Sequence, residues 1–330
     1  MAVPLPLLRQ LQDGPAERAW ASVMAFAWEV FSKPLEPNGA PHEVSHRDTQ
    51  LAGVDLFLMT AGWDLWREFD ATVEHTADAL IRWWDETPGG KAVLILDALS
   101  LREASWILHG AAARGYKVEG RVTGAELPAD TTQFARALGF GQRSSLANNM
   151  AGGAHKLTGA RTDCVDYPWA ECHSLVGAEP RVVLWHQWPD SRLHDYAVPG
   201  QGVIALTKEV AERLNDEAFW TLIDRLTTGR RLVITSDHGY AATGSFADTT
   251  DPEQKEYLKE IYASGRWAKA DGSAPPAWLP PLDLTLETRQ GRNRFVLGRR
   301  KWRSQGGYPT LAHGGLSVLE VASPFIEISR

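Results

Sequence analysis

The chain has 330 residues, of which 44% are hydrophobic and 23% are charged, and its formal net charge is −7. This composition is ordinary for a soluble globular protein, and the length suits one large α/β domain or a domain with a substantial insertion. The negative charge argues against bulk electrostatic binding to nucleic acid, and the absence of a run of about 18 apolar residues argues against a membrane span. Cys164 and Cys172 do not make a disulfide framework, and the N-terminus lacks a signal-peptide layout. We therefore expect a cytoplasmic protein.

Two amphipathic patterns near the start of the chain predict helices. Apolar residues at helical spacing run over residues 16–33, and Pro34 ends this pattern. A second run covers residues 63–84. Neither pattern contains a constellation of chemically active residues, so we expect residues 1–88 to form a helical packing segment beside a domain of residues 89–330.

The alternation of strand and helix patterns that follows predicts an α/β core. Residues 92–96 are continuously apolar, which is typical of a strand covered on both faces. Residues 100–114 have a helical pattern that begins with a capping box of Ser100 and Glu103, and residues 116–122 are the next strand. This order predicts a three-layer α/β/α architecture with a doubly wound sheet.

Further elements continue this pattern toward the C-terminus. Apolar strands are expected at residues 181–185 and 232–235, with a helix over residues 207–227 between them. Residues 241–285 hold a polar helix and a proline-rich loop, which indicate an inserted cap or lid. A last helix and strand are expected within residues 316–328.

Two polar stretches allow more than one interpretation. Residues 140–180 are rich in small and polar residues and contain both Cys164 and Cys172. The spacing of these cysteines is far from that of zinc ribbons, which favours an irregular cover loop over a Cys-His metal site. Residues 289–303 carry seven arginine or lysine residues and no acidic residue. They indicate either a solvated hairpin or a surface for an anionic ligand.

Potential metal ligands follow the ends of three apolar strands or precede the last strand: Asp97, Asp190, His194, Asp237, His238 and His313. Ligands in open α/β sheets gather at the carboxyl ends of the strands, so we expect these side chains to converge. Three carboxylates and three imidazoles are enough for two metal ions that share a nucleophile.

The motifs around these ligands resemble those of the alkaline phosphatase superfamily and, within it, PglZ-type domains. They occur in the superfamily's chain order over about residues 90–330 and read Asp97-Ala98-Leu99, Asp190-x-x-x-His194, Thr235-Ser236-Asp237-His238-Gly239 and His313-Gly314-Gly315. The resemblance implies an alkaline phosphatase-like fold and two divalent metal ions. One ion would be bound by Asp190, His194 and His313, and the other by Asp97, Asp237 and His238. Imidazole ligands favour zinc, with manganese as the alternative.

The resemblance also implies a threonine nucleophile. Pro128-Ala129-Asp130-Thr131 matches the Pro-x-x-Thr turn of similar phosphodiesterases, so Thr131 is expected to open a helix beside the metals. Thr132 and Ser100 are competing candidates, and Thr131 could instead be a plain N-cap residue. Similar enzymes place an asparagine three residues after the threonine, where this chain has Phe134. This motif therefore does not specify which residue binds the nonbridging phosphoryl oxygen.

The activity implied is a metal-dependent phosphoesterase. A phosphodiester, nucleotide or nucleic acid is the preferred substrate over a simple monoester, because the arginine-rich stretch could hold a second anionic group. PglZ-like domains are associated with bacterial anti-phage systems, which implies a role in phage defence with other defence-system proteins as partners. The alternative is a catalytically weak or inactive binding and assembly component, which would retain metal but show no turnover.

Overall fold

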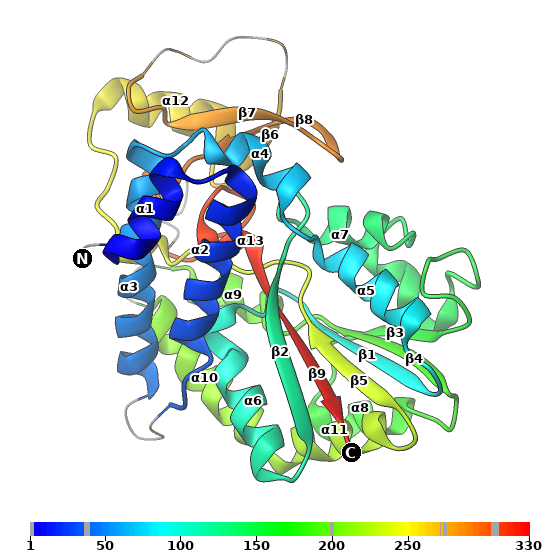
Figure 1. Cartoon of the computed structure of the whole chain (residues 1–330). Helices are drawn as coiled ribbons and strands as arrows, with labels where there is room; N and C mark the ends of the chain where they lie inside the picture. The colour runs from blue at the N-terminus through cyan, green and yellow to red at the C-terminus, as the bar shows by residue number, and fades with distance from the viewer. Residues whose placement is uncertain are drawn as a thin grey trace.

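The computed structural model describes residues 3–35, 40–198, 201–270, 272, 276, 278–304 and 310–330. At its centre lies a six-stranded sheet in the order β2-β9-β5-β1-β4-β3 (Figure 1). The strands are β1 (Lys91–Leu96), β2 (Lys117–Gly124), β3 (Arg161–Val165), β4 (Arg181–His186), β5 (Arg231–Thr235) and β9 (Ala322–Ser329). Strand β1 is parallel to β4 and β5, and β3 is parallel to β4, whereas β9 is antiparallel to β5 and β2. The sheet is therefore mostly parallel.

Helices cover both faces of this sheet, which confirms the expected three-layer α/β architecture. On β1, Val93 and Ile95 join the core on one face, whereas Ala92 and Leu94 join the core on the other. The first face is covered by α5 (Thr76–Glu86) and α7 (Thr131–Ala137). The second face is covered by α6 (Ala104–Ala113), α8 (Trp169–Cys172), α10 (Val203–Asn215) and α11 (Glu217–Thr227). Because both faces are covered, the expected strands β1, β4 and β5 are continuously apolar.

The N-terminal helices pack beside the sheet and contribute to a separate core. They are α1 (Leu5–Asp13), α2 (Ala16–Phe31), α3 (Ala40–Thr60) and α4 (Leu65–Thr72). Helix α2 matches the prediction, but the pattern over residues 63–84 forms two helices, α4 and α5. Between them Val73 and His75 are extended, and the carbonyl of Glu74 accepts the N–H of Gly124 at 2.8 Å. This hydrogen bond joins the break to the end of β2, so tertiary pairing overrides the helical periodicity.

Two other predictions of local structure were wrong. The helix expected over residues 207–227 is two helices, because Asp216 is extended and its carboxylate caps α11 at the N–H of Ala218, at 2.9 Å. The stretch 140–180 is not only a cover loop, since it contains β3 at the edge of the sheet. The capping box of Ser100 and Glu103 is present, at the 3-10 turn that leads into α6.

A small second layer of structure lies above the sheet in Figure 1. It contains α12 (Pro252–Tyr262) and a sheet of β6 (Trp267–Lys269), β8 (Gly291–Val296) and β7 (Asp283–Thr288). We call residues 252–302 the cap. The remaining helices are α9 (Asp190–Tyr196) and α13 (Val318–Val321).

The arginine-rich stretch forms the turn between β7 and β8, strand β8 itself and the segment after it. Arg289 donates to Asp78 at 2.7 Å, and Arg292 lies 3.2 Å from Glu287. Arg299 is fully buried and donates to Asp48 and Asp55, both at 2.7 Å. These three arginines are therefore partners of carboxylates within the chain.

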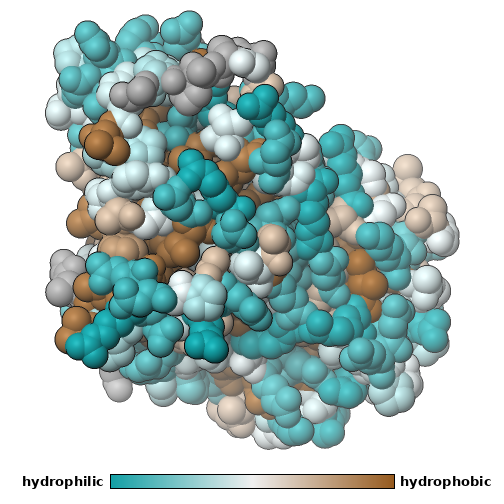
Figure 2. Space-filling model, turned by 45° about the horizontal axis from the view of Figure 1, so that its top comes forward, coloured by the Kyte–Doolittle hydropathy of each residue, from teal (hydrophilic) through white to brown (hydrophobic). Residues whose placement is uncertain are grey.

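Most apolar side chains lie inside the protein. Hydrophilic residues cover most of the face shown in Figure 2, with smaller hydrophobic areas gathered mainly on its left half. In the described part of the chain, no helix combines the length and the hydropathy needed to cross a membrane.

Candidate metal centre

The carboxyl ends of the parallel strands bring the expected ligands together. Asp97 directly follows β1, Asp190 opens the helix after β4, and Asp237 and His238 follow β5. Strand β9 runs antiparallel to β5, so its first residues lie at the same edge of the sheet. His313 precedes α13 and β9 and therefore reaches this edge from the opposite chain direction.

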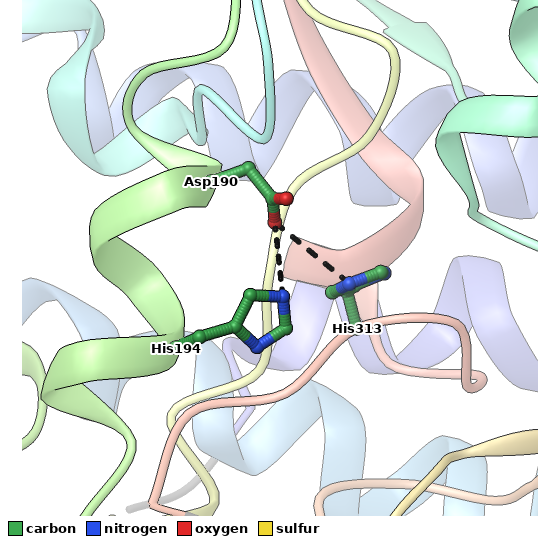
Figure 3. Close-up of side chains that lie close together, drawn as sticks. All are labelled: Asp190, His194 and His313. Atoms are coloured by element: carbon green, nitrogen blue, oxygen red, sulfur yellow. Dashed lines mark ion pairs between the residues drawn. The ribbon is translucent and has the colours of Figure 1, made fainter.

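The first group of side chains consists of Asp190, His194 and His313 (Figure 3). Asp190 and His194 are one helical turn apart on α9, and His313 approaches from the loop before α13. Asp190 Oδ1 lies 3.8 Å from Nε2 of each histidine. This oxygen is buried and has no hydrogen-bond partner among the described residues. A buried carboxylate oxygen without a donor is costly unless a cation or a donor approaches it.

The second group consists of Asp97, Asp190 and His238, whose ligand atoms lie within 4.8 Å of one another. Asp190 therefore belongs to both groups, which differs from the expected division into two separate sets of three. Asp237 was expected in the second set. Its Oδ1 accepts the N–H of Ala98 at 2.9 Å and that of His238 at 3.0 Å. Its Oδ2 is buried, has no hydrogen-bond partner within the described ranges and lies 3.4 Å from His238 Nε2.

Backbone carbonyls orient two of the imidazoles. His238 Nδ1 lies 2.9 Å from the carbonyl of Gly239, and His313 Nδ1 lies 3.3 Å from the carbonyl of Ala129. When each Nδ1 carries a proton and donates it to these carbonyls, the lone pair of Nε2 faces the carboxylates. The two rings are stacked with centroids 4.2 Å apart and an interplanar angle of 14°.

The crowding of carboxylates perturbs the pKa values of the buried groups. Burial, followed by the negative charges of Asp237 and Asp190, raises the pKa of Asp97 well above its usual range. Burial lowers the pKa of His238, but the same cluster of carboxylates outweighs it and raises the pKa to about 9. Burial and the neighbouring His238 lower the pKa of His313. Divalent cations would neutralise this excess of negative charge, so the donor set fits them.

Thr131 lies beside the second group. Its Oγ1 donates to Asp97 Oδ1 at 3.2 Å and is 3.5 Å from His238 Nε2. Thr131 opens α7 as expected, but the N-cap is Asp130, whose carboxylate accepts the N–H of Thr132 at 2.9 Å. The Thr131 hydroxyl is therefore not used as a cap. Ser100 is fully buried and belongs to its capping box.

Two residues at the centre had no signal in the sequence. Arg143 Nη1 donates to Asp97 Oδ2, and its Nη2 donates to Gln187 at 3.4 Å. The same carboxylate oxygen accepts the indole N–H of Trp185 at 3.0 Å. Arg143 comes from the irregular stretch 140–180, where no periodicity ties a residue to the site, and Trp185 looks like any apolar residue of β4.

The cysteines lie outside both groups. Cys164 is half-buried on β3, and Cys172 is buried on α8 with its Sγ 3.5 Å from the carbonyl of Tyr167. Burial raises the pKa of Cys164 to about 11, so this side chain is a neutral thiol. Within the described ranges, neither cysteine joins a group of potential metal ligands.

Comparisons with known proteins give a fold-level similarity only. No protein-family model and no curated protein matches the chain. Among solved structures, the chain is similar to an inactive variant of murine ectonucleotide pyrophosphatase/phosphodiesterase 5 in complex with AMP, with 11% sequence identity and a TM-score of 0.40. The aligned region covers 73% of this chain and 88% of the murine chain.

Proposed function

We propose that this chain is a metal-dependent phosphoesterase of the alkaline phosphatase superfamily. The observation that carries the proposal is Asp190 Oδ1, a buried oxygen that faces Nε2 of both His194 and His313 and finds no donor in the part of the chain that the structure describes. Through Asp190 this group overlaps the group that contains Asp97 and His238. Two overlapping sets of ligands suit two divalent cations, with zinc preferred over manganese because imidazoles take part. Asp237 Oδ2 is a further ligand for the second cation.

Thr131 is the proposed nucleophile. The bound cations supply positive charge that polarises a phosphoryl group and lowers the pKa of a nearby hydroxyl. Thr131 Oγ1 is held at the centre by Asp97 Oδ1, 3.2 Å away. The Thr131 hydroxyl would release its proton to solvent as its oxygen bonds to phosphorus, while the bond from phosphorus to the leaving oxygen breaks and that oxygen takes a proton from water. A second water would then cleave the phosphothreonine, which releases the phosphate product and restores the Thr131 hydroxyl.

Arg143 is the proposed partner of a nonbridging phosphoryl oxygen. Phe134, which takes the place of the expected asparagine, is fully buried against Trp185 and has no side-chain donor for a phosphoryl oxygen. The Arg143 side chain is 27% exposed and contacts Asp97, so its guanidinium lies at the border between solvent and the centre. A guanidinium presents paired N–H donors that match phosphoryl oxygens.

The proposed substrate class is a phosphate ester, with nucleotides and other phosphodiesters included. The proposed preference for diesters does not rest on Arg289, Arg292 and Arg299 of the arginine-rich stretch, because these three are paired with carboxylates within the chain. A PglZ-type role in phage defence with protein partners is proposed from the chain order of the sequence motifs.

The test compares the metal-loaded chain with two neighbouring threonine variants. The metal content of the purified chain is measured, and turnover of p-nitrophenyl phosphate and of bis(p-nitrophenyl) phosphate is followed with zinc or manganese. We expect Thr131→Ala to lose about 10³-fold or more in kcat, as nucleophile removal does in other hydrolases. Thr132→Ala, one residue further along α7, is the matched control and should retain turnover. Equal turnover in Thr131→Ala and the unmodified chain would exclude the proposed mechanism.

A further inference from the structure

One buried residue, Glu320, holds the turn that carries His238 through its backbone carbonyl and the turn that carries His313 through its carboxylate. Its backbone carbonyl accepts the N–H of Gly239 at 3.0 Å, and its Oε1 accepts the N–H of Gly315 at 2.8 Å. Gly239 directly follows His238, and Gly315 lies two residues after His313. Glu320 therefore fixes the positions of both histidine-bearing turns relative to α13.

The two turns also approach their supports too closely for a larger residue. A Cβ atom added at Gly239 would lie 2.2 Å from the carbonyl oxygen of Leu319. Gly314 has a φ of +100°, and a Cβ atom there would lie 2.6 Å from Cδ1 of Trp267 in the cap. The turn after His313 is therefore packed directly against the cap, while the turn after His238 is packed against α13.

Arg266, the residue directly before β6 in the cap, fixes the Glu320 carboxylate in turn. Its Nε donates to Glu320 Oε1 at 2.6 Å, and its Nη2 donates to Oε2 at 3.1 Å. The guanidinium also donates to the carbonyl of Arg300 at 2.9 Å and to the carbonyl of Gly298. Ser317 Oγ donates to Glu320 Oε2 at 2.6 Å. Arg266 is only 2% exposed, so this two-pronged pair is shielded from water.

From these contacts we infer that Arg266 and Glu320 are positioning residues for the metal centre. They do not contact the ligand atoms, and their charges compensate each other. Their effect on bound metal is therefore through the position of His313, whose turn the carboxylate holds at Gly315, and through the α13 backbone, whose Glu320 carbonyl holds the turn of His238, rather than through added charge. The cap, which overlaps the inserted cap or lid expected over residues 241–285, is by this inference a fixed support for the two histidines. The inference rests on the proposed function, because the two imidazoles are taken as metal ligands.

The test measures metal affinity without using turnover. The metal-free whole chain is titrated with cobalt(II), and binding is followed by calorimetry and by the visible absorption of the bound ion. The test variant is Arg266→Met. The matched control is Arg230→Met, since Arg230 is a buried arginine that donates to backbone carbonyls at the opposite end of β5. Thermal unfolding of each variant reports its overall stability.

We expect Arg266→Met to weaken cobalt binding by about 10-fold or more and to change the absorption spectrum, as loss of outer-shell support does at metal sites. Arg230→Met should bind cobalt like the unmodified chain even where it lowers the unfolding temperature. Arg266→Lys keeps the charge but not the paired donors. If Arg266→Met does not fold, the cobalt affinity and spectrum of Arg266→Lys test the positioning role instead. A folded Arg266 variant that binds cobalt with the same affinity and the same absorption spectrum as the unmodified chain overturns the positioning role. Absence of cobalt binding in the unmodified chain overturns the proposed function itself, and the positioning role with it.

Discussion

The buried imidazole of His186 makes the free energy of unfolding depend on pH. It is the last residue of β4 and is fully buried. Its Nε2 lies 2.8 Å from the carbonyl of Tyr167, and its Nδ1 accepts the N–H of Trp188 at 3.0 Å. Both nitrogens are therefore satisfied only in the neutral ring with the proton on Nε2, since a second proton would face the N–H of Trp188.

Burial lowers the pKa of His186 from 6.5 to about 4, although the nearby Asp166 carboxylate acts in the opposite direction. A lowered pKa in the folded state means that the unfolded chain takes up this proton first as the pH falls. The associated stability is fully present above pH 6.5 and is lost as the pH falls toward 4. At roughly 1.4 kcal/mol per pH unit, His186 lowers the free energy of unfolding by about 2 kcal/mol between pH 7 and pH 5.

The assay is urea unfolding at pH 7 and pH 5 in the presence of a metal chelator. His186→Asn keeps an oxygen that can accept the N–H of Trp188 but cannot take up the proton. Its change in unfolding free energy between the two pH values should be smaller than that of the unmodified chain by about 2 kcal/mol. His173→Asn, at an exposed position, is the matched control because it leaves the buried imidazole in place. If His186→Asn and the unmodified chain lose equal stability on acidification, the reasoning is refuted.

Two further predictions concern the metal centre and the N-terminal helices. Asp190→Asn should lower the measured zinc stoichiometry from two toward zero, because Asp190 belongs to both ligand groups. His194→Ala should remove one ion at most, because His194 belongs to one group only. Equal losses of zinc in the two variants would contradict the shared role of Asp190. Asp48→Ala should lower the free energy of unfolding at pH 7 by about 3 to 5 kcal/mol, because it leaves two buried arginines without a shared carboxylate. A loss below about 1 kcal/mol in urea unfolding would show that the pairs are dispensable.

The strands of the core, and the carboxylates and histidines that follow them, could be predicted from the sequence. Strands β1, β4 and β5 are buried on both faces, so their apolar runs are continuous, and a carboxylate or histidine follows each run. The parallel arrangement then places Asp97, Asp190 and His238 at one edge of the sheet, where the structure brings them together. The capping box before α6 could be predicted because its partners are three residues apart.

Helix α3 shows why the N-terminal layer was harder to predict. It buries Asp48 and Asp55, so its inward face is not marked by apolar residues alone. These carboxylates are stable inside the protein because Arg299 lies against both, about 250 residues later in the chain. Sequence periodicity records only neighbours within a few turns, so it cannot show such a pair.

The sequence by itself determined which residue types stand at the ends of the core strands, because burial and local hydrogen bonding leave a pattern in consecutive residues. Only the tertiary structure decided how those residues are shared. It placed Asp190 in both ligand groups, brought Arg143 to Asp97, and joined the cap to the histidine turns through Arg266 and Glu320. These arrangements depend on distances between segments that are far apart in the chain, and such distances are set by the packing of the layers rather than by any local preference.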